Sequence, residues 1–446
     1  MVDGVLAIES DTIAAIATPA GVGGVGVIRV SGPGAAAIVG EVIGRPSEEL
    51  PDRQLVLGVA RAPDGTRLDQ VLAVVMRAPR SYTGEDVGEL HGHGGAWNMA
   101  RLLRAVTARG ARHAEPGEFT RRAFEHGKLD LVEAEAVLGI IEAGSERAWR
   151  VAQTQLEGQL GRAIDRYRAI GTVLLAELEA GIDFPEEDVD YLRETRAGDR
   201  AAELERELAA LVASFGLGRA LREGLIVVLV GQVNAGKSSL FNALVGSERA
   251  VVTSEPGTTR DFVEAQVIWD GVPVTLVDTA GERAAATTEA EVRGMELGRA
   301  RARAADVRIR IVAAPDWEGA VVSGPDLMAV SKGDLAPERV FEQAVVTSAR
   351  TGDGLEALRA AVLERALCDA TEAGEGVVLS TERQRAIAAR AAEAYGRCRE
   401  AIERGAAIEV IALEARTGLE ALAEMRGERV AEDVLDALFA RFCIGK

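Results

Sequence analysis

The segment Leu225-Ile-Val-Val-Leu-Val-Gly-Gln-Val-Asn-Ala-Gly-Lys-Ser-Ser239 decides the fold of the middle of this chain. Its first six residues form an uninterrupted apolar run, which is typical of a strand buried on both faces of a parallel sheet. The glycine-rich part leads directly into SLFNALVG, which favours a helix beginning near Ser239. A Gly-x-x-x-x-Gly-Lys-Ser segment between a strand and a helix is a P-loop, which binds phosphate groups.

The residue types of this loop indicate how a nucleotide would be held. Backbone N–H groups at the start of the helix close around phosphate oxygens, Lys237 neutralises the β and γ phosphates, and the Ser238 hydroxyl ligates Mg²⁺. The other loop residues expected at the nucleotide are Asn234, Ala235, Gly236 and Ser239. A purely structural glycine-rich turn is the alternative, and it leaves the flanking strand and helix unexplained.

Further apolar runs recur at 274–277, 307–312 and 345–346, and helical stretches separate the strands. This alternation is typical of a parallel α/β sheet. The first of these runs ends in Asp278-Thr279-Ala280-Gly281, where a carboxylate can hold the water shell of Mg²⁺ and a glycine N–H can sense the γ-phosphate. An ordinary turn at the end of a strand is the alternative for these residues.

A β-hairpin is predicted between the two phosphate motifs. Residues 263–269 and 272–277 alternate between apolar and polar around Asp270-Gly271, a pair that favours a tight turn. The preceding segment, 253–261, is polar and is expected to form a loop beside the nucleotide. Such a loop is suited to switching between nucleotide states.

Base recognition is predicted from Ser331-Lys332-Gly333-Asp334 and from Thr347-Ser348-Ala349, each placed after an apolar run. A carboxylate that accepts hydrogen bonds from N1 and the exocyclic amine of guanine rejects adenine, which has no such pair of donors. The two segments resemble the Asn-Lys-x-Asp and Ser-Ala elements of GTPases, with serine in place of asparagine. The residues expected at the base are Ser331, Lys332, Asp334, Ser348, Ala349 and Arg350.

Composition excludes several classes of protein. Among 446 residues, Lys plus Arg number 51 and Asp plus Glu 70, so the net charge of −19 argues against non-specific attachment to nucleic acid or anionic lipid. A hydrophobic content of 48% excludes wholesale disorder. Three widely spaced cysteines, no leader-like beginning and no run of about 18 uncharged apolar residues predict a cytoplasmic protein without a membrane partner.

Changes of composition along the chain also predict several domains. Residues 1–121 mix short β-type runs with Gly and Pro turns, which predicts an α+β domain. Helix-forming residues dominate 122–219 and return at 374–446, on either side of the predicted sheet at 220–373. We therefore expect a multidomain α/β and α protein, in which a P-loop domain with a mostly parallel sheet is inserted into one discontinuous helical domain.

These motifs belong to a longer pattern that resembles one family, the tRNA-modification GTPase called MnmE or TrmE. The resemblance covers nearly the whole chain, through DTIAAIATPAGVGGVGVIRVSG, SYTGEDVGELHGHGG, PGEFTRRAFEHGKLDLVEAEAV, IDFPEED and FCIGK. It implies an N-terminal domain that binds tetrahydrofolate and dimerises, a discontinuous helical domain and a G domain within it. By the same resemblance, a tetrahydrofolate derivative in the 5-formyl or methylene form contacts Arg29, Glu89, Lys128 and Lys446. Basic groups can meet folate carboxylates and a carboxylate can pair with the donor edge of the pterin, although ordinary surface charge is the plainer alternative.

The resemblance also implies how hydrolysis is catalysed. A K⁺ ion supplies the positive charge that an arginine finger supplies in other GTPases. The residues that match its ligands are Asn234, Thr253, Glu255 and Thr258, and Thr259 matches a second Mg²⁺ ligand. Ser254, Pro256 and Gly257 complete the loop expected at the GTP. Glu291 aligns with the glutamate that positions the catalytic water, so Glu291 and Lys237 are the expected catalytic residues, with a solvated acidic loop as the alternative for Glu291.

Two further features leave alternatives open. Cys443 in the segment FCIGK suggests either thiol chemistry or a structural role near the folate. His91 and His93 suggest a metal pair, but no further ligands accompany them in sequence, so a packed or hydrogen-bonded role is favoured.

The function implied by the resemblance is that of a homodimeric, potassium-stimulated GTPase. With an FAD-dependent partner, MnmG, in a heterotetramer-type complex, it adds a carboxymethylaminomethyl-type group to C5 of the wobble uridine of certain tRNAs, with tetrahydrofolate as the one-carbon donor. FAD enters only through the partner. A ribosome-assembly or regulatory GTPase is one alternative, and a folate-dependent transferase that uses nucleotide only to stabilise its dimer is another.

Overall fold

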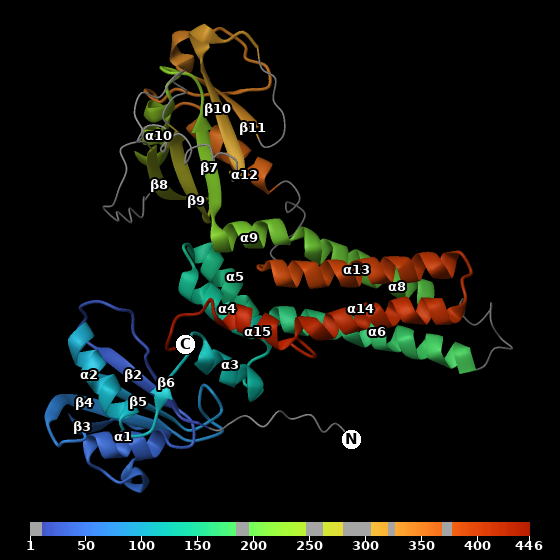
Figure 1. Cartoon of the computed structure of the whole chain (residues 1–446). Coiled ribbons are helices and arrows are strands. Elements are labelled where there is room, and N and C mark those ends of the chain that lie inside the picture. Colours follow the sequence, from blue (N-terminus) through green and yellow to red (C-terminus); the bar gives the residue numbers. More distant parts are fainter. Residues whose placement is uncertain (1–10, 184–195, 247–261, 280–304, 320–325, 368–376) are drawn as a thin grey trace. The chain divides into compact units, whose positions relative to one another are not determined.

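The computed structural model describes residues 11–183, 196–246, 262–279, 305–319, 326–367 and 377–446 (Figure 1). The chain divides into two compact units, of which unit 1 comprises Met1–Leu138 with Arg426–Lys446 and unit 2 comprises Gly139–Met425. Helix α4 (Leu131–Glu142) runs across the boundary in sequence. Among the helices within the described ranges, none combines the length and the apolar character needed to cross a bilayer.

Unit 1 is built on a six-stranded sheet in the order β3-β4-β5-β2-β1-β6. Neighbouring strands are antiparallel except β1 and β6, which are parallel. The strands are β1 (Ile13–Ile16), β2 (Gly26–Ser31), β3 (Val56–Arg61), β4 (Arg67–Met76), β5 (Val87–Gly92) and β6 (Arg112–His113). The helices are α1 (Ala35–Ile43), α2 (Ala96–Thr107), α3 (Glu118–Glu125), the first part of α4, and α15 (Glu432–Phe439), with a 3-10 turn η1 at Ser47–Glu49.

The two faces of this sheet differ in character. Helices α1 and α2 cover one face, where their apolar side chains pack against alternate residues of the strands such as Ile28 and Val30. The intervening side chain of β2, Arg29, therefore lies on the opposite face, and Glu89 of β5 is its register partner. Phe119 of α3 packs against β1 on that second face. The polar face is thus the one available for ligand chemistry.

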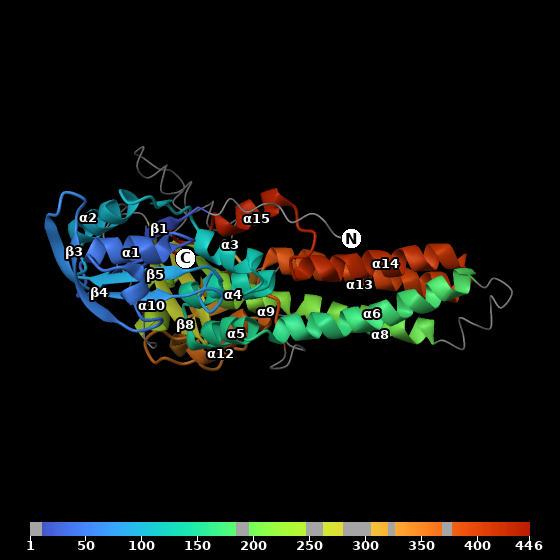
Figure 2. The same cartoon turned by 90° about the horizontal axis from the view of Figure 1, so that it is seen from below.

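Unit 2 contains a bundle of four long helices, which Figure 2 shows running side by side. They are α6 (Gln159–Asp183), α8 (Ala197–Ala213), α13 (Glu382–Glu403) and α14 (Ile408–Met425). Two precede the sheet of unit 2 in sequence and two follow it, and α13 packs on both α8 and α14. In chain order, α5 (Glu146–Leu156) precedes the bundle helices, and α9 (Phe215–Glu223) lies between α8 and the sheet. The helices that precede the sheet in sequence and those that follow it therefore form one helical core.

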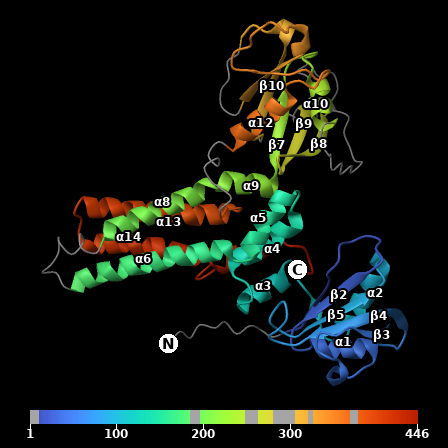
Figure 3. The same cartoon turned by 180° about the vertical axis from the view of Figure 1, so that it is seen from behind.

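Within the described residues, the sheet of unit 2 has the strand order β12-β11-β10-β7-β9-β8, and β8 is the one antiparallel strand among them. Figure 3 labels β7, β8, β9 and β10 of this sheet, together with α10 and α12. Helices α10 and α12 pack on the same face of it, which confirms the predicted mostly parallel α/β sheet. The strands are β7 (Leu225–Val230), β8 (Phe262–Trp269), β9 (Val272–Thr279), β10 (Val307–Ala313), β11 (Asp326–Ser331) and β12 (Val345–Val346). The helices are α10 (Lys237–Gly246) and α12 (Leu355–Ala366), with 3-10 turns η3 (Ala314–Asp316) and η4 (Gly333–Leu335).

The predicted hairpin is confirmed by β8 and β9, and its turn is tied to a helix. Asp270 and Gly271 both have positive φ, at 48° and 76°, as a tight hairpin turn requires. Ser145, the N-cap of α5, accepts a hydrogen bond from the N–H of Ala148 and donates one to the carbonyl oxygen of Gly271, 2.6 Å away. Arg147 donates to the carbonyl of Asp270 at 3.3 Å. The hairpin between the two phosphate motifs is therefore anchored to α5.

Short connections follow β10 and β11. Within the described residues these connections contain the 3-10 turns η3 and η4 and no α-helix. A small cluster stabilises them: Trp317 and Phe341 pack edge to face at 5.8 Å, and Arg339 stacks on Phe341 while donating to the carbonyl of Trp317 at 2.6 Å. The two arginines of β10, Arg308 and Arg310, both pair with the buried carboxylate of Asp326.

Candidate nucleotide and anion sites

The P-loop lies where β7 ends and α10 begins. Gly231 has a φ of 155°, and a Cβ there would lie 2.4 Å from the carbonyl oxygen of Ile311, so only glycine fits this close approach. Lys237 is 7% exposed, and its ammonium group donates to the carbonyls of Gly231 and Gln232 at 2.9 and 2.8 Å. The lysine is thus held inside the loop that would surround the phosphates.

Asp278 ends β9 beside the P-loop strand, since it pairs in register with Leu229 of β7. Its side chain is 8% exposed, and within the described residues its Oδ1 has no hydrogen-bond partner. A buried carboxylate oxygen without a donor is costly. The site is therefore suited to a cation or its bound water at this position.

The base-recognition segments come together around a cavity of about 310 Å³ beside the start of α10. The carboxylate of Asp334 accepts from the Ser348 hydroxyl at 2.8 Å and pairs with Arg350 at 2.9 Å. The hydrogen bond from Ser348 and the charge of Arg350 lower the pKa of Asp334, so the group is a carboxylate and an acceptor. The residues that line the cavity are Gly236, Ser239, Leu240, Ser331, Lys332, Asp334, Leu335, Thr347, Ala349 and Arg350.

Ser331 connects this base pocket to the P-loop. It is 4% exposed, and its hydroxyl donates to the carbonyl of Ala235 at 2.5 Å. Lys332 makes a parallel contact, from its ammonium group to the carbonyl of Asn234 at 2.9 Å. Asn234 has a φ of 66°, which turns the loop at that point. Ser331 thus links the base pocket to the P-loop, and its hydroxyl hydrogen is already donated to the carbonyl of Ala235.

Several predicted site residues lie outside the described residues. They are Thr253, Ser254, Glu255, Pro256, Gly257, Thr258 and Thr259 of the expected switch loop, together with Ala280, Gly281 and Glu291. Thr279 belongs to β9, and Ser238 is an exposed residue in the first turn of α10.

A second cluster of charges lies on the polar face of the unit 1 sheet. Arg29 pairs with Glu89 at 2.9 Å, and His91 also contacts Glu89 at 2.9 Å. Arg29 donates to the carbonyl of Gly445 at 3.5 Å, which brings the neighbouring Lys446 to the same cluster. Burial, together with the positive charge of Arg29, lowers the pKa of Lys446. Lys128 instead donates from its ammonium group to the carbonyl of Pro79 at 3.1 Å. Three of the four predicted folate contacts are therefore brought together.

Two aromatic rings beside this cluster were not predicted as site residues. The guanidinium of Arg29 lies 5.7 Å from the ring centre of Tyr82 and 5.9 Å from that of Phe119. Tyr82 and Phe119 lie within SYTGED and PGEFTRR, two of the motifs that carried the family resemblance, which was the one available signal. Two cations, a carboxylate and two rings can hold a flat, anionic ligand.

The remaining candidates have ordinary partners. His93 contacts the carboxylate of Asp69 at 2.8 Å, so both histidines of HGHGG make hydrogen bonds. Cys443 is an exposed free thiol, and its carbonyl accepts from the N–H of Gly117 at 3.4 Å.

A mostly parallel sheet with a P-loop after one strand, and an aspartate-lined cavity beside that loop, defines a P-loop nucleotide-binding protein of the GTPase class. The family model of the GTP-binding protein TrmE N-terminus matches residues 12–128, and that of the MnmE helical domain matches residues 131–443. The chain belongs to the MnmE family, also called TrmE.

Full-length relatives agree with this membership. The tRNA modification GTPase MnmE of Syntrophotalea carbinolica is 39% identical over 98% of this chain and 100% of its own length. The protein of the same name from Synechococcus sp. (strain RCC307) is 41% identical over 99% of this chain and 100% of its own. Among solved structures, the G domain of the T. maritima FeoB iron transporter is 24% identical, covers 32% of this chain and 98% of that chain, and has a TM-score of 0.25.

Proposed function

We propose that this protein is a tRNA modification GTPase, which binds and hydrolyses GTP and couples the change of state to the modification of tRNA. The observation that carries the proposal is the P-loop beside a cavity lined by Asp334, in a chain that matches MnmE proteins from end to end. The substrate is GTP because a carboxylate in that cavity accepts from the two donors of the guanine edge.

The described residues account for nucleotide binding. Lys237 would turn from the carbonyls of its own loop to the β and γ phosphates, which offer a stronger, charge-assisted hydrogen bond. Asp334 would exchange the contact with Arg350 for the guanine N1 and amine donors, while Ser348 keeps its position. Asn234, at the exposed turn of the loop, would face the phosphates from the other side.

Two cations are part of this proposal. Mg²⁺ would be held by Ser238 and Thr259, with Asp278 accepting from its bound waters, and the Asp278 oxygen that has no hydrogen-bond partner among the described residues fits that role. K⁺ would be held at Asn234, Thr253, Glu255 and Thr258. When bound, these cations supply positive charge against the phosphates. Lys237 adds to that charge, and Glu291 would position the attacking water.

The wider assembly is also proposed. A tetrahydrofolate derivative would bind at Arg29, Glu89, Lys446 and Lys128, and the chain would form a homodimer through the domain of residues 1–121. The helical domain would be 122–219 with 374–446, and the G domain 220–373. In the cytoplasm, the dimer would act with the FAD-dependent partner MnmG on C5 of the wobble uridine of certain tRNAs.

The test of the GTPase is hydrolysis by the purified protein in potassium chloride and in sodium chloride at matched ionic strength, with ATP as the control nucleotide. We expect hydrolysis of GTP that is stimulated by potassium and lost in Glu291→Ala. Equal rates in both salts would contradict the potassium site, and an active variant would remove Glu291 from the mechanism. Unchanged wobble-uridine modification in cells that lack the protein, with co-sedimentation on ribosomes, would favour a ribosome-assembly GTPase instead.

A further inference from the structure

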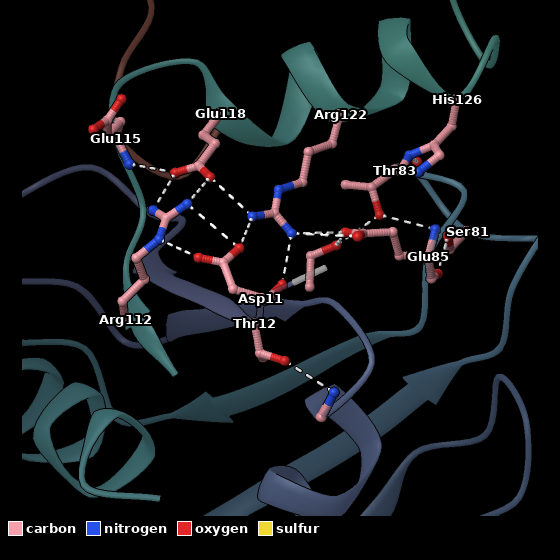
Figure 4. A network of polar contacts seen from close by, with 12 residues as sticks. Asp11, Thr12, Ser81, Thr83, Glu85, Arg112, Glu115, Glu118, Arg122 and His126 are labelled. Atoms are coloured by element: carbon pink, nitrogen blue, oxygen red, sulfur yellow. Dashed lines mark hydrogen bonds and ion pairs between the residues drawn. The ribbon is translucent and has the colours of Figure 1, made fainter. Parts of the chain in front are cut away.

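A buried arginine joins three carboxylates in unit 1 (Figure 4). Arg122 of α3 is 5% exposed, and its guanidinium contacts Asp11 at 2.6 Å, Glu118 at 3.0 Å and Glu85 at 3.2 Å. It also donates to the backbone carbonyl of Asp11 at 2.9 Å. These partners come from the segment that leads into β1, from α3 itself and from the loop 81–86, so one side chain connects three separate segments.

A second arginine balances part of the negative charge. Arg112 of β6 pairs with Glu118 at 2.6 Å and with Asp11 at 2.5 Å. Burial raises the pKa of Glu118, but the hydrogen bonds from Arg112 and Arg122 outweigh this effect and lower it, so the network is ionic. Glu85 pairs with Arg122 rather than with Arg112. The loop carboxylate therefore depends on Arg122 for its charge partner.

The loop 81–86 is organised around Glu85. Its carboxylate accepts from the Ser31 hydroxyl at 2.8 Å, and that hydroxyl lies 2.7 Å from the hydroxyl of Thr83. Ser81 donates to the backbone carbonyl of Glu85 at 2.5 Å, and His126 contacts the carbonyl of Thr83 at 2.8 Å. Figure 4 shows Glu85, Thr83 and Ser81 gathered at one end of the network. Charge and hydrogen bonds together fix the backbone of the loop.

The loop and α3 each present one aromatic ring to Arg29. Tyr82 lies in the loop and Phe119 on α3, at 5.7 and 5.9 Å from the Arg29 guanidinium. A hydrogen bond of 2.9 Å between the hydroxyls of Tyr82 and Thr120 links the two elements again, on the side of the rings. The two segments that Arg122 joins are thus the two that build the aromatic side of the Arg29 cluster.

We propose that Arg122 is a positioning residue for the Arg29 cluster. Arg122 holds Tyr82 and Phe119 where their rings confine the Arg29 guanidinium and present a flat apolar surface to an anionic aromatic ligand. The ligand class, a folate, rests on the proposed function. Without Arg122, Asp11 and Glu118 keep Arg112 while Glu85 loses its charge partner, and the repulsion among the three carboxylates displaces the loop that carries Tyr82.

The experiment compares Arg122→Gln with Arg121→Gln in the full chain. Arg121 is a matched control because it lies on the same helix and is also ion-paired, but with Glu125, Glu432 and Asp436. We expect Arg122→Gln to weaken binding of 5-formyltetrahydrofolate about tenfold or more, since a buried ionic partner is lost, while Arg121→Gln changes it less than about twofold. GTP hydrolysis, which takes place in unit 2, is expected to stay unchanged in both.

A second readout does not need the ligand. Hydrogen exchange of the backbone amides of residues 81–86, measured by mass spectrometry, is expected to accelerate in Arg122→Gln and to stay unchanged in Arg121→Gln. If the unchanged protein fails to bind 5-formyltetrahydrofolate, the proposed folate site is wrong, and this exchange experiment alone then decides whether Arg122 positions the loop. Unchanged exchange in a folded Arg122→Gln protein would overturn the positioning role.

A milder pair of variants covers the case in which Arg122→Gln does not fold. Tyr82→Phe and Thr120→Val each remove one end of the hydroxyl–hydroxyl bond and keep the size of the side chain. We expect each to weaken folate binding about threefold, and the double variant to be no weaker than either single one, because both changes remove one shared contact. Full-strength binding in both single variants would overturn the proposal.

Discussion

The two sites of this protein are built in opposite ways. The nucleotide site comes from one stretch of chain, residues 231–350, whose strand ends meet at one edge of a parallel sheet. The Arg29 cluster combines segments far apart in sequence: Arg29 lies within 3.5 Å of the carbonyl of Gly445, 416 positions away. In a parallel sheet, the carboxyl ends of the strands bring functional residues together at one edge. In the mixed sheet of unit 1, separate segments have to be held against one another to form a site.

The two sites also differ in how far their polar groups pair with one another. Around Arg122, carboxylates and guanidinium groups meet one another directly. At the nucleotide site, Lys237 contacts the carbonyls of its own loop, and Asp278 Oδ1 has no hydrogen-bond partner within the described ranges. The network of unit 1 pairs its own charges, whereas the nucleotide site leaves groups that suit a charged ligand.

The largest expected effect concerns the lysine of the P-loop. Lys237→Ala removes the ammonium group that meets the phosphates, so GTP hydrolysis is expected to fall by about 10²- to 10³-fold, as for other lost electrostatic contacts in catalysis. Steady-state hydrolysis measures the loss, and folate binding by the same variant serves as the control. A rate within about twofold of the unchanged protein would show that Lys237 makes no transition-state contact.

The next prediction concerns pH at the Arg29 cluster. Burial, followed by the charge of Arg29, lowers the pKa of Lys446, and only the charged ammonium attracts a folate carboxylate. Folate affinity is therefore expected to decline as pH rises, beginning below the ordinary lysine pKa. In Lys446→Met, affinity should fall about tenfold at neutral pH and lose this decline. Titration by calorimetry over a pH series checks both, and a decline that persists in the variant would assign it to another group.

An intermediate effect is expected where the hairpin of the nucleotide sheet meets α5. Ser145→Ala removes both a helix cap and the hydrogen bond to Gly271, so unit 2 should lose about 1–2 kcal/mol of unfolding free energy. Thr381→Ala is the matched control, because Thr381 caps α13 and accepts from the N–H of Gln384. Denaturant unfolding compares the two. Equal losses would mean that the contact with the hairpin contributes nothing to stability.

The smallest expected effect concerns the base pocket. The Ser331 hydroxyl is used by the carbonyl of Ala235, whereas an asparagine amide carries both a donor and an acceptor. Ser331→Asn is therefore expected to tighten GTP binding by about fivefold, the worth of one further hydrogen bond. Fluorescence titration with a labelled guanine nucleotide measures the change. Weaker binding would indicate that the link to Ala235 matters more than the base contact.

The sequence predicted the nucleotide half of the molecule well because its signals are local. The apolar run before Gly231, the P-loop and the Asp270-Gly271 turn each determine their own structure within a few residues, and the structure confirms the strand, the helix and the hairpin. The predicted helix block was less accurate. Gly158, with a φ of 78°, separates α5 from α6, although the composition of this block indicates helix throughout. Helix-forming composition does not show where the chain turns.

Features that depend on distant contacts were not predictable. Tyr82 and Phe119 meet Arg29 where a loop and a helix from separate parts of the sequence come together, and no spacing in the sequence encodes that meeting. The packing of Trp317 against Phe341 likewise becomes visible only when two short connections lie together. The resemblance supplied Arg29, Glu89 and Lys446, while the aromatic rings required the structure.

The division of unit 1 in the sequence has a consequence for how the protein is made. Its second part, Arg426–Lys446, is translated after the whole of unit 2. At about 5 to 20 residues per second, the roughly 290 intervening residues take about 15 to 60 s to synthesise. During that time Leu131 and Leu138 lack Phe439 and Phe442, their later packing partners. A chain terminated within unit 2 carries the P-loop but lacks Arg426–Lys446, so unit 1 is completed only after the whole of unit 2 has been made.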